Sequence, residues 1–163
     1  FTVTPIQMLN MVCAIVDDGK LKKPYVVKEV LNGDGSVKST NETEVVRQVI
    51  SEDTSAYMRG AMEQVVANGT GKNVYVPGYR VGGKTATSQT LPRGSGRYIS
   101  SFIGFAPADD PQVIAIAIIN NPQGIYYGGQ VAAPIIRQLY ENILPYLGLE
   151  KTEEPEETAE SGE

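Results

Sequence analysis

The strongest constraint on the fold of this chain comes from residues 81–89, which have the sequence VGGKTATSQ. Small and polar side chains alternate there with a period of two, which is typical of a β-strand. The two faces would carry Lys84, Ala86 and Ser88 on one side and Thr85, Thr87 and Gln89 on the other. A row of hydroxyl and amide groups is unusual in a core, and it suits hydrogen bonding to an extended ligand that carries a carboxylate. Gly82 and Gly83 would let another backbone or a ligand approach closely.

A nucleotide-binding interpretation of the same segment is a remote alternative. Residues 78–85 satisfy the phosphate-loop pattern G-x-x-x-x-G-K-[ST], in which a helix begins at the lysine and threonine and backbone N–H groups hold the phosphates. The segment after Thr85, residues 86–94, is instead rich in β-branched residues and turn formers. The later apolar run, residues 113–119, ends in Asn120 and not in the aspartate that a P-loop NTPase would need.

Composition excludes several kinds of chemistry. The chain has 163 residues, of which 41% are hydrophobic, so it can bury the core of one domain. Its formal net charge of −5, with no basic stripe, argues against nucleic acid as a partner. The absence of histidine excludes Ser–His–Asp, Cys–His and histidine–metal chemistry, and the single Cys13 excludes an internal disulfide. No cofactor or metal is expected, and Cys13 is predicted to be an inert packing residue.

The sequence predicts a helix near the start of the chain. Thr4 is a suitable N-cap, and Gln7 completes a capping box with it. Pro5 fits the first helical position, where its missing N–H costs nothing. The helix would end at Gly19, which can adopt the left-handed conformation of a C-terminal cap.

A surface hairpin and a second helix are predicted next. Residues 25–31 would form a strand, residues 32–35 a turn, and residues 36–39 a short returning strand. The second helix would begin after the cap residue Ser51, because apolar residues then recur at helical spacing. Residues 68–69, an Asn-Gly pair, would end it.

Three strands joined by short loops are predicted at residues 81–89, 98–106 and 113–119, with a last helix over residues 130–146. The third strand is apolar on both faces, as expected for a central strand that is covered on both sides. Its small Ala115 and Ala117 would allow a helix to lie close to one face. The fold class is therefore α+β, with an antiparallel sheet flanked by helices.

Residues 82–89 resemble the G-G-K-T-G-T-x-Q segment of class B penicillin-binding proteins, the peptidoglycan D,D-transpeptidases of cell division and sporulation. The resemblance covers nearly the whole chain up to about Leu149. It is also carried by the segments TVTPIQ, GTG, SFIGFAP and YGGQVAAP at residues 2–7, 69–71, 101–107 and 127–134.

The resemblance implies the C-terminal part of the penicillin-binding transpeptidase fold, which is similar to that of the serine β-lactamases. Residues 1–149 would supply the last three strands of its five-stranded antiparallel sheet and the closing helix. Residues 150–163 would be an acidic, disordered tail or linker. The family's S-x-x-K and S-x-N motifs match no position here and would lie upstream of Phe1. The isolated chain is therefore not expected to be active.

The reaction implied by the resemblance is serine acyl transfer, which cross-links peptidoglycan stem peptides and is intercepted by β-lactams. Lys84 would supply positive charge and help proton transfer. The hydroxyls of Thr85 and Thr87 would bind the terminal carboxylate, and the N–H of Thr87 would be an oxyanion donor. The further residues expected to line the substrate groove are Gly83, Ala86, Gln89 and Tyr127.

The resemblance also implies partners and a location. The partners would be the upstream half of the domain and wall-synthesis proteins of division or sporulation. The protein would work at the extracytoplasmic face of a bacterial membrane, anchored by an N-terminal segment absent from this sequence. Ala86 departs from the family, whose third box residue is glycine. Its methyl group would crowd whatever lies beside Lys84, so a non-catalytic, peptide-binding pseudoenzyme is the main alternative.

Overall fold

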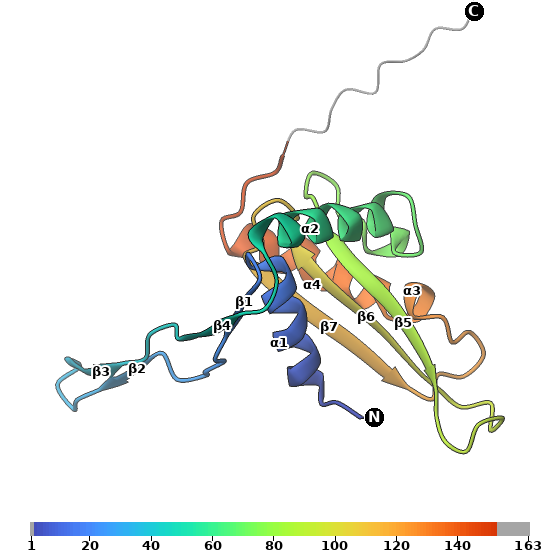
Figure 1. Ribbon diagram of the computed structural model, residues 1–163, viewed down its shortest axis with the longest axis horizontal. Helices are drawn as coiled ribbons and strands as arrows, with labels where there is room; N and C mark the ends of the chain where they lie inside the picture. The colour runs from blue at the N-terminus through green and yellow to red at the C-terminus, as the bar shows by residue number, and fades with distance from the viewer. Residues whose placement is uncertain (1, 153–163) are drawn as a thin grey trace, which may run out of the picture. The chain divides into compact units, whose positions relative to one another are not determined.

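The computed structural model describes residues 2–152 (Figure 1). The chain divides into two compact units, residues 1–61 and residues 62–163. Helix α2 (Glu52–Ala67) runs across the boundary between them. Most of the predicted acidic tail, from residue 153 onward, lies outside the described residues.

The first unit begins with helix α1 (Pro5–Val16). The predicted capping box is confirmed, because the Thr4 hydroxyl accepts a hydrogen bond from the Gln7 N–H at 3.3 Å and the Gln7 side chain accepts one from the Thr4 N–H at 2.8 Å. The predicted left-handed glycine is confirmed as well, with φ of 77° at Gly19. A side chain at Gly19 would also collide with the carbonyl of Ile50, since its Cβ would lie 2.1 Å from that oxygen.

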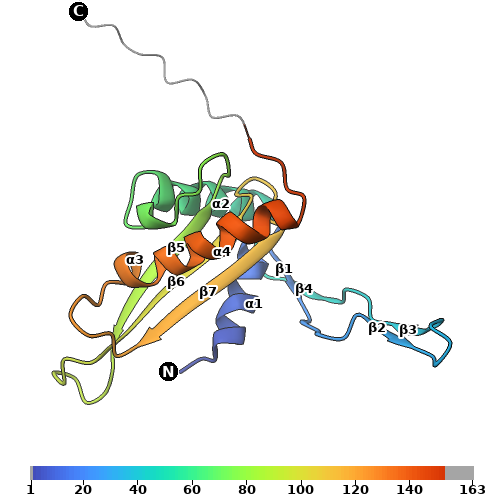
Figure 2. The same ribbon diagram turned by 180° about the vertical axis from the view of Figure 1, so that it is seen from behind.

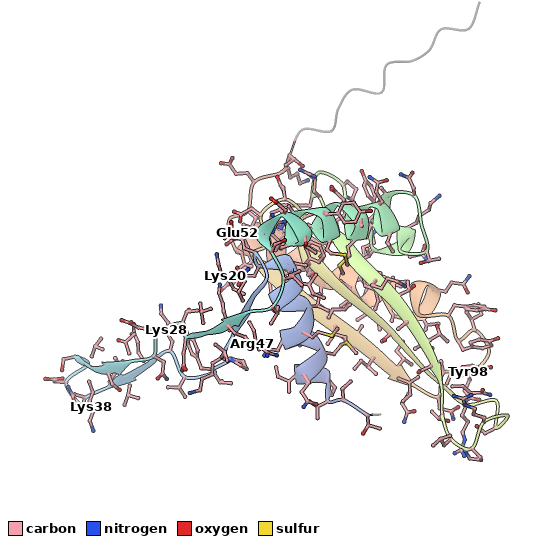
Figure 3. The ribbon with its side chains drawn as sticks, viewed as in Figure 1. Lys20, Lys28, Lys38, Arg47, Glu52 and Tyr98 are labelled. Carbon is pink, nitrogen blue, oxygen red and sulfur yellow. The ribbon has the colours of Figure 1, made fainter. Side chains whose placement is uncertain are left out.

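The predicted hairpin is present, but it is built from two short ladders. Strand β2 (Glu29–Leu31) pairs with β3 (Val37–Thr40), and β1 (Lys20–Lys22) pairs with β4 (Val45–Gln48). The predicted strand 25–31 is therefore shorter than expected, and β1 and β4 were not predicted. Every residue from 23 to 49 is exposed, so β2, β3 and β4 gain little from packing and pair only over short stretches. Lys28 and Lys38 lie along this arm (Figure 3).

Helix α2 begins where the sequence predicted. The hydroxyl of Ser51 accepts a hydrogen bond from the Thr54 N–H at 3.2 Å, which satisfies one of the free donors of the first turn. In the first unit the Ser55 hydroxyl donates to the Ile15 carbonyl at 2.7 Å, which ties α2 to the end of α1. The last turns of α2 belong to the second unit, where Val66 joins the core.

The second unit is a three-stranded antiparallel sheet in the order β5-β6-β7, with β5 (Gly82–Gln89), β6 (Tyr98–Ala106) and β7 (Val113–Asn120). Helices α3 (Gly128–Val131) and α4 (Ala133–Tyr146) lie across one face of the sheet, as Figure 2 shows. A short 3-10 helix, η1 (Lys72–Val74), packs against α4. The structure thus confirms the predicted α+β class with its antiparallel sheet.

The core of the second unit lies between the sheet and α4. Its largest fully buried side chains are Phe102 on the central strand and Ile136, Tyr140 and Leu144 on the helix. Ala117 belongs to this cluster, and Ala115 packs against it. The prediction that these small residues let a helix lie close to the sheet is therefore confirmed.

Two predictions about this sheet and its helices are not met by the described residues. Among the described strands β7 lies at one edge, because β6 lies between β5 and β7, and Ile118 on β7 is 44% exposed, so the described residues do not cover both faces of β7. The last helix is not continuous from residue 130, because α3 ends at Val131 and α4 begins at Ala133. Proline at position 134 lacks an N–H and favours the first turn of a new helix, which accounts for the break.

A hydrogen bond from the hydroxyl of Tyr140 attaches α4 to the sheet. It donates a hydrogen bond of 2.6 Å to the carbonyl of Gly104, and both groups are buried. Substitution Tyr140→Phe leaves that carbonyl without this donor and should lower the free energy of unfolding by about 1–3 kcal/mol. Urea denaturation measures the change, and Tyr146→Phe on the same helix, where the tyrosine is 87% exposed, is the matched control. Equal effects of the two substitutions would contradict this assignment.

Candidate functional site

The segment that dominates the sequence forms β5, and this overturns the nucleotide-binding alternative. Lys84 and Thr85 lie inside the strand, where they pair with Ile103 and Phe102 of β6. A phosphate loop would need a helix to begin at these two residues, so that free N–H groups point at the phosphates. The strand uses alternate N–H groups for the ladder instead, and the P-loop interpretation is wrong.

The two glycines before Lys84 make room for aromatic rings of the neighbouring strand. A Cβ at Gly82 would lie 2.3 Å from the ring of Phe105, and a Cβ at Gly83 would lie 2.5 Å from the ring of Phe102. The phenylalanines lie on opposite faces of β6, so each glycine accommodates one of them. The close approach that the sequence predicted is therefore made by side chains of the same sheet.

The free edge of β5 can be assigned from the hydrogen bonds at its ends. Beyond one end, the Thr90 N–H donates to the Arg97 carbonyl at 2.9 Å, and beyond the other, the Ala108 N–H donates to the Arg80 carbonyl at 2.9 Å. In an antiparallel ladder, alternate residues point both backbone groups toward the partner strand. Even-numbered residues of β5 therefore bond to β6, and the N–H and C=O groups of Thr85 and Thr87 point away from it.

The predicted division of β5 into two faces agrees with the structure. The Thr87 hydroxyl accepts a hydrogen bond from the Gly128 N–H at 3.1 Å, and the hydroxyls of Thr85 and Thr70 are 3.1 Å apart. These two threonines thus face α3 and the loop that follows α2. Both hydroxyls have protein partners in addition to any ligand that they bind.

Lys84 lies on the opposite face of β5 and is exposed. Its ammonium group donates a hydrogen bond of 2.8 Å to the carbonyl of Thr85, and it lies 3.5 Å from the Thr85 hydroxyl. The lysine is therefore bent over the free edge of its own strand. Positive charge is thus placed beside backbone groups that no strand within residues 2–152 uses.

The start of α3 is packed against β5 and β6 more closely than any side chain would allow. A Cβ at Gly128 would lie 2.3 Å from the Ser101 carbonyl oxygen and 2.5 Å from that of Ala86. A Cβ at Gly129 would lie 2.2 Å from the carbonyl oxygen of Thr70. Glycine at position 128 lets the helix start reach the two strands, and glycine at position 129 lets it reach the loop after α2.

Tyrosine rings gather at the far end of β5. The rings of Tyr98 and Tyr126 are stacked with centroids 4.1 Å apart, and Tyr127 lies 4.7 Å from Tyr126. Tyr98 is paired with Gln89 in the ladder and lies at the end of the sheet beside the β5–β6 loop (Figure 3). The hydrogen bond between Tyr126 and Tyr127 raises the pKa of Tyr127 above its usual value.

The predicted site residues thus lie along one strand and one adjacent loop. Lys84, Thr85, Thr87 and Gln89 follow each other on β5, and Tyr127 immediately precedes α3. Thr70, Gly128 and Tyr98 also belong to this region, and sequence reasoning did not select them as site residues. The GTG and YGGQ segments contained two of them, but only the structure shows that both segments contact β5.

One expectation about sequence motifs needs correction. The letters of the S-x-N motif do occur, at residues 39–41, where Ser39-Thr40-Asn41 runs through the end of β3. The Asn41 side chain donates a hydrogen bond of 2.6 Å to the Val27 carbonyl, so it closes the exposed arm. This match is therefore explained by hairpin structure.

Residues 2–152 contain no group of three side chains suited to hold a metal ion. In the same range no helix has the length and apolar character needed to cross a membrane. Burial, with a smaller contribution from Asp17, raises the pKa of the Cys13 thiol, which keeps it protonated. This agrees with the prediction that Cys13 is a packing residue.

An antiparallel sheet crossed by a C-terminal helix, with a Lys-Thr strand at its edge, defines the class of penicillin-recognising serine enzymes. The model of the penicillin binding protein transpeptidase domain matches residues 1–141 of this chain. The chain belongs to this family.

Relatives and solved structures agree with that assignment. Stage V sporulation protein D of Bacillus subtilis (strain 168) is 47% identical over 155 residues, which cover 91% of this chain and 24% of the relative. PbpB of Mycolicibacterium smegmatis is 32% identical over 152 residues, which cover 85% of this chain and 23% of the relative. The crystal structure of penicillin binding protein 3 from Mycobacterium tuberculosis, complexed with ampicillin, has a TM-score of 0.80 at 30% identity, covering 94% of this chain and 37% of that one. The chain spans about a quarter of the length of these curated relatives.

The contact between α3 and β5 can be tested by adding one methyl group. Substitution Gly128→Ala places a Cβ inside the contact distance of two backbone carbonyls, so α3 must move away from β5. We expect a loss of about 1–3 kcal/mol or more in the free energy of unfolding, measured by urea denaturation. Gly33→Ala, where a Cβ would meet no atom within 4 Å, is the control. An unchanged stability of the Gly128 variant would show that this contact is loose.

Proposed function

We propose that this chain is the C-terminal part of a peptidoglycan D,D-transpeptidase domain, whose serine nucleophile lies in a part of the protein outside these residues. The observation that carries the proposal is the free edge of β5, with an ammonium group and two threonine hydroxyls beside it. The membership of the transpeptidase family supports it.

The reaction would be acyl transfer between two stem peptides. The serine oxygen attacks the carbonyl of the D-Ala-D-Ala bond, the C–N bond breaks, and the terminal D-alanine leaves with a proton. An amine of a second stem then attacks the resulting ester and releases the serine. A β-lactam enters the first step, but its opened ring remains attached to the serine.

The free edge of β5 is suited to the first step. The N–H of Thr87 points away from β6, so it is available to a negatively charged oxygen that develops on the attacked carbonyl. Such a donor contributes most when it is already oriented, because the strand then needs no rearrangement during the reaction. We assign Thr87 as an oxyanion donor through its backbone.

The side chains of this edge are suited to hold the end of a peptide. Lys84 places its charge beside the edge, and the hydroxyls of Thr85 and Thr87 lie on the adjoining face. A carboxylate accepts hydrogen bonds from hydroxyls and is attracted by an ammonium group. Gly83, Ala86, Gln89 and Tyr127 would complete the groove, with the stacked tyrosines at its far end.

Exposed isoleucines on the face of the sheet that carries Lys84 support the proposal that another part of the protein packs there. Ladder pairing places isoleucines of β6 and β7 on this face, among them Ile99, which is 38% exposed, and Ile118, which is 44% exposed. Apolar surface of this kind marks a contact with another element. In our proposal, that element belongs to the part of the domain that carries the nucleophile.

The partners and location are inferred from the relatives. One relative is named as a sporulation protein, and one solved neighbour is complexed with ampicillin. We propose that this chain binds stem peptides and β-lactams, and that it acts with other wall-synthesis proteins of sporulation or division. The substrate would place it at the extracytoplasmic face of a membrane, anchored by a segment outside this sequence.

A second function is favoured by one observation, the alanine at position 86. If its methyl group displaces the element that carries the nucleophile, the complete protein would bind peptide without turnover. This pseudoenzyme would keep the groove strand and lose acylation. The two functions differ in their reaction with penicillin.

Labelling with a fluorescent penicillin tests the proposed function. The complete protein that contains this chain should form a covalent adduct that survives denaturing gel electrophoresis, and residues 1–163 alone should form none. Lys84→Ala in the complete protein should reduce labelling by at least about tenfold, because a charge beside the reacting groups is removed. Lys72→Ala, which removes an exposed lysine of η1, is the control. An adduct with the isolated chain would contradict our placement of the nucleophile.

The role of Ala86 is tested by restoring the glycine of the family. Ala86→Gly should increase the acylation rate of the complete protein, because it removes a methyl group from the Lys84 face of β5. The strand itself should lose no more than about 1 kcal/mol, since glycine weakens a strand interior. Stopped-flow acylation measures the rate. An unmodified protein that binds penicillin reversibly, and that Ala86→Gly converts to covalent labelling, would favour the pseudoenzyme.

A further inference from the structure

We propose that Thr70 is a positioning residue for the carboxylate site. Its hydroxyl donates a hydrogen bond to the hydroxyl of Thr85, and this leaves the hydrogen of Thr85 directed toward the ligand. The inference rests on the proposed function and adds to it a residue outside the Lys84 strand. Thr70 lies in the loop that follows α2, fifteen positions before its partner, and its Oγ1 is 3.1 Å from that of Thr85. Either hydroxyl can donate in this contact, and the proposal assigns the donor role to Thr70.

The loop that carries Thr70 is fixed by contacts of its own. The Gly71 N–H donates to the Val65 carbonyl at 2.9 Å, which closes the end of α2. The Asn73 side chain donates to the Gly129 carbonyl at 2.8 Å, and the carbonyl of Thr70 lies so close to Gly129 that no Cβ fits between them. Thr70 is therefore held against α3 and β5 independently of its own hydroxyl.

The hydrogen bonds around Thr85 then determine what its hydroxyl can do. A hydroxyl has one hydrogen to donate and two lone pairs to accept with. The Lys84 ammonium group can only donate, and it lies 3.5 Å from the Thr85 oxygen, at the outer limit of hydrogen bonding. If Thr70 donates as well, both lone pairs of Thr85 are used and its hydrogen is left for an acceptor such as a carboxylate.

The neighbouring hydroxyl of Thr87 is arranged in the same way, and there the direction of the hydrogen bond is fixed. Its partner is the N–H of Gly128, which has no capacity to accept. The Thr87 hydrogen is thus also left for a ligand. With Thr70 as the donor to Thr85, the two hydroxyls present two hydrogens on one face of β5, which matches the two oxygens of a carboxylate.

A water molecule in place of the Thr70 hydroxyl would not have this effect. The loop holds the Thr70 oxygen in place, whereas a water molecule can move and reorient, so water would leave the Thr85 hydrogen free to turn away from the ligand. The contribution of Thr70 is therefore orientation before binding, which lowers the cost of holding the carboxylate.

The test uses the complete protein with Thr70→Val, which removes the hydroxyl and keeps the shape, and Thr70→Ser, which restores a hydroxyl. Thr90→Val is the matched control, since the Thr90 hydroxyl donates to the Arg97 carbonyl at the other end of β5. Acylation is measured with a penicillin and with its methyl ester, and the dissociation constant is separated from the first-order acylation rate constant. Thermal unfolding of each variant is recorded in parallel.

We expect Thr70→Val to weaken binding of the free acid by about two- to tenfold, the value of one hydrogen bond, with the first-order rate constant unchanged. Thr70→Ser and Thr90→Val should bind like the unmodified protein, and the ester should react equally with all four. Equal losses for acid and ester, no loss with Thr70→Val, or no rescue by Thr70→Ser would overturn the inference. If the unmodified protein is not acylated at all, the proposed function fails and the inference with it. Normal acylation with an unaffected Thr70→Val variant rejects the role of Thr70 alone.

Discussion

The packing of the α3 start on strand β5 is the contact on which the rest of the second unit depends. Two successive glycines let the helix start reach the carbonyls of two strands and of the loop after α2, and the Gly128 N–H donates to the Thr87 hydroxyl. Four segments of the chain meet there: the start of α3, strands β5 and β6, and the loop after α2. Because backbone meets backbone, the contact has almost no adjustable side-chain freedom, and this holds β5 in one position relative to α4 and the core.

This contact also supplies hydrogen-bond partners to the unusually polar strand β5. A strand with a row of hydroxyls gains little from burial, so its polar face needs hydrogen-bond partners to be stable. The partners of Thr85 and Thr87 come from the loop after α2 and from α3, and each threonine keeps a donor or acceptor for something else. The same hydroxyls therefore stabilise the fold, and in the proposed function they also bind the carboxylate of the ligand.

The parts of this structure that sequence predicted are those set by neighbouring residues. The capping box of Thr4 and Gln7, the cap at Ser51 and the alternation along β5 each depend on a few successive positions, and each was predicted correctly. The contact of Thr70 with Thr85 and the stacking of Tyr98 on Tyr126 depend on how distant segments meet, which no local pattern encodes. The expectation that β7 is covered on both sides rested on its apolar residues alone, and these do not show which other segments cover the strand.

The alternation of side chains along β5 places the two threonines and Ala86 on opposite faces of the strand. Thr85 and Thr87 face α3, whereas Lys84 and Ala86 face the other way, beside the isoleucines of β6 and β7. The methyl group of Ala86 is therefore directed away from both hydroxyls and from their partners. Any effect of alanine at this position therefore falls on whatever packs against the Lys84 face. In the proposed function, the two hydroxyls that hold the carboxylate lie on the opposite face from this methyl group, so a change at position 86 leaves their hydrogen-bond partners in place.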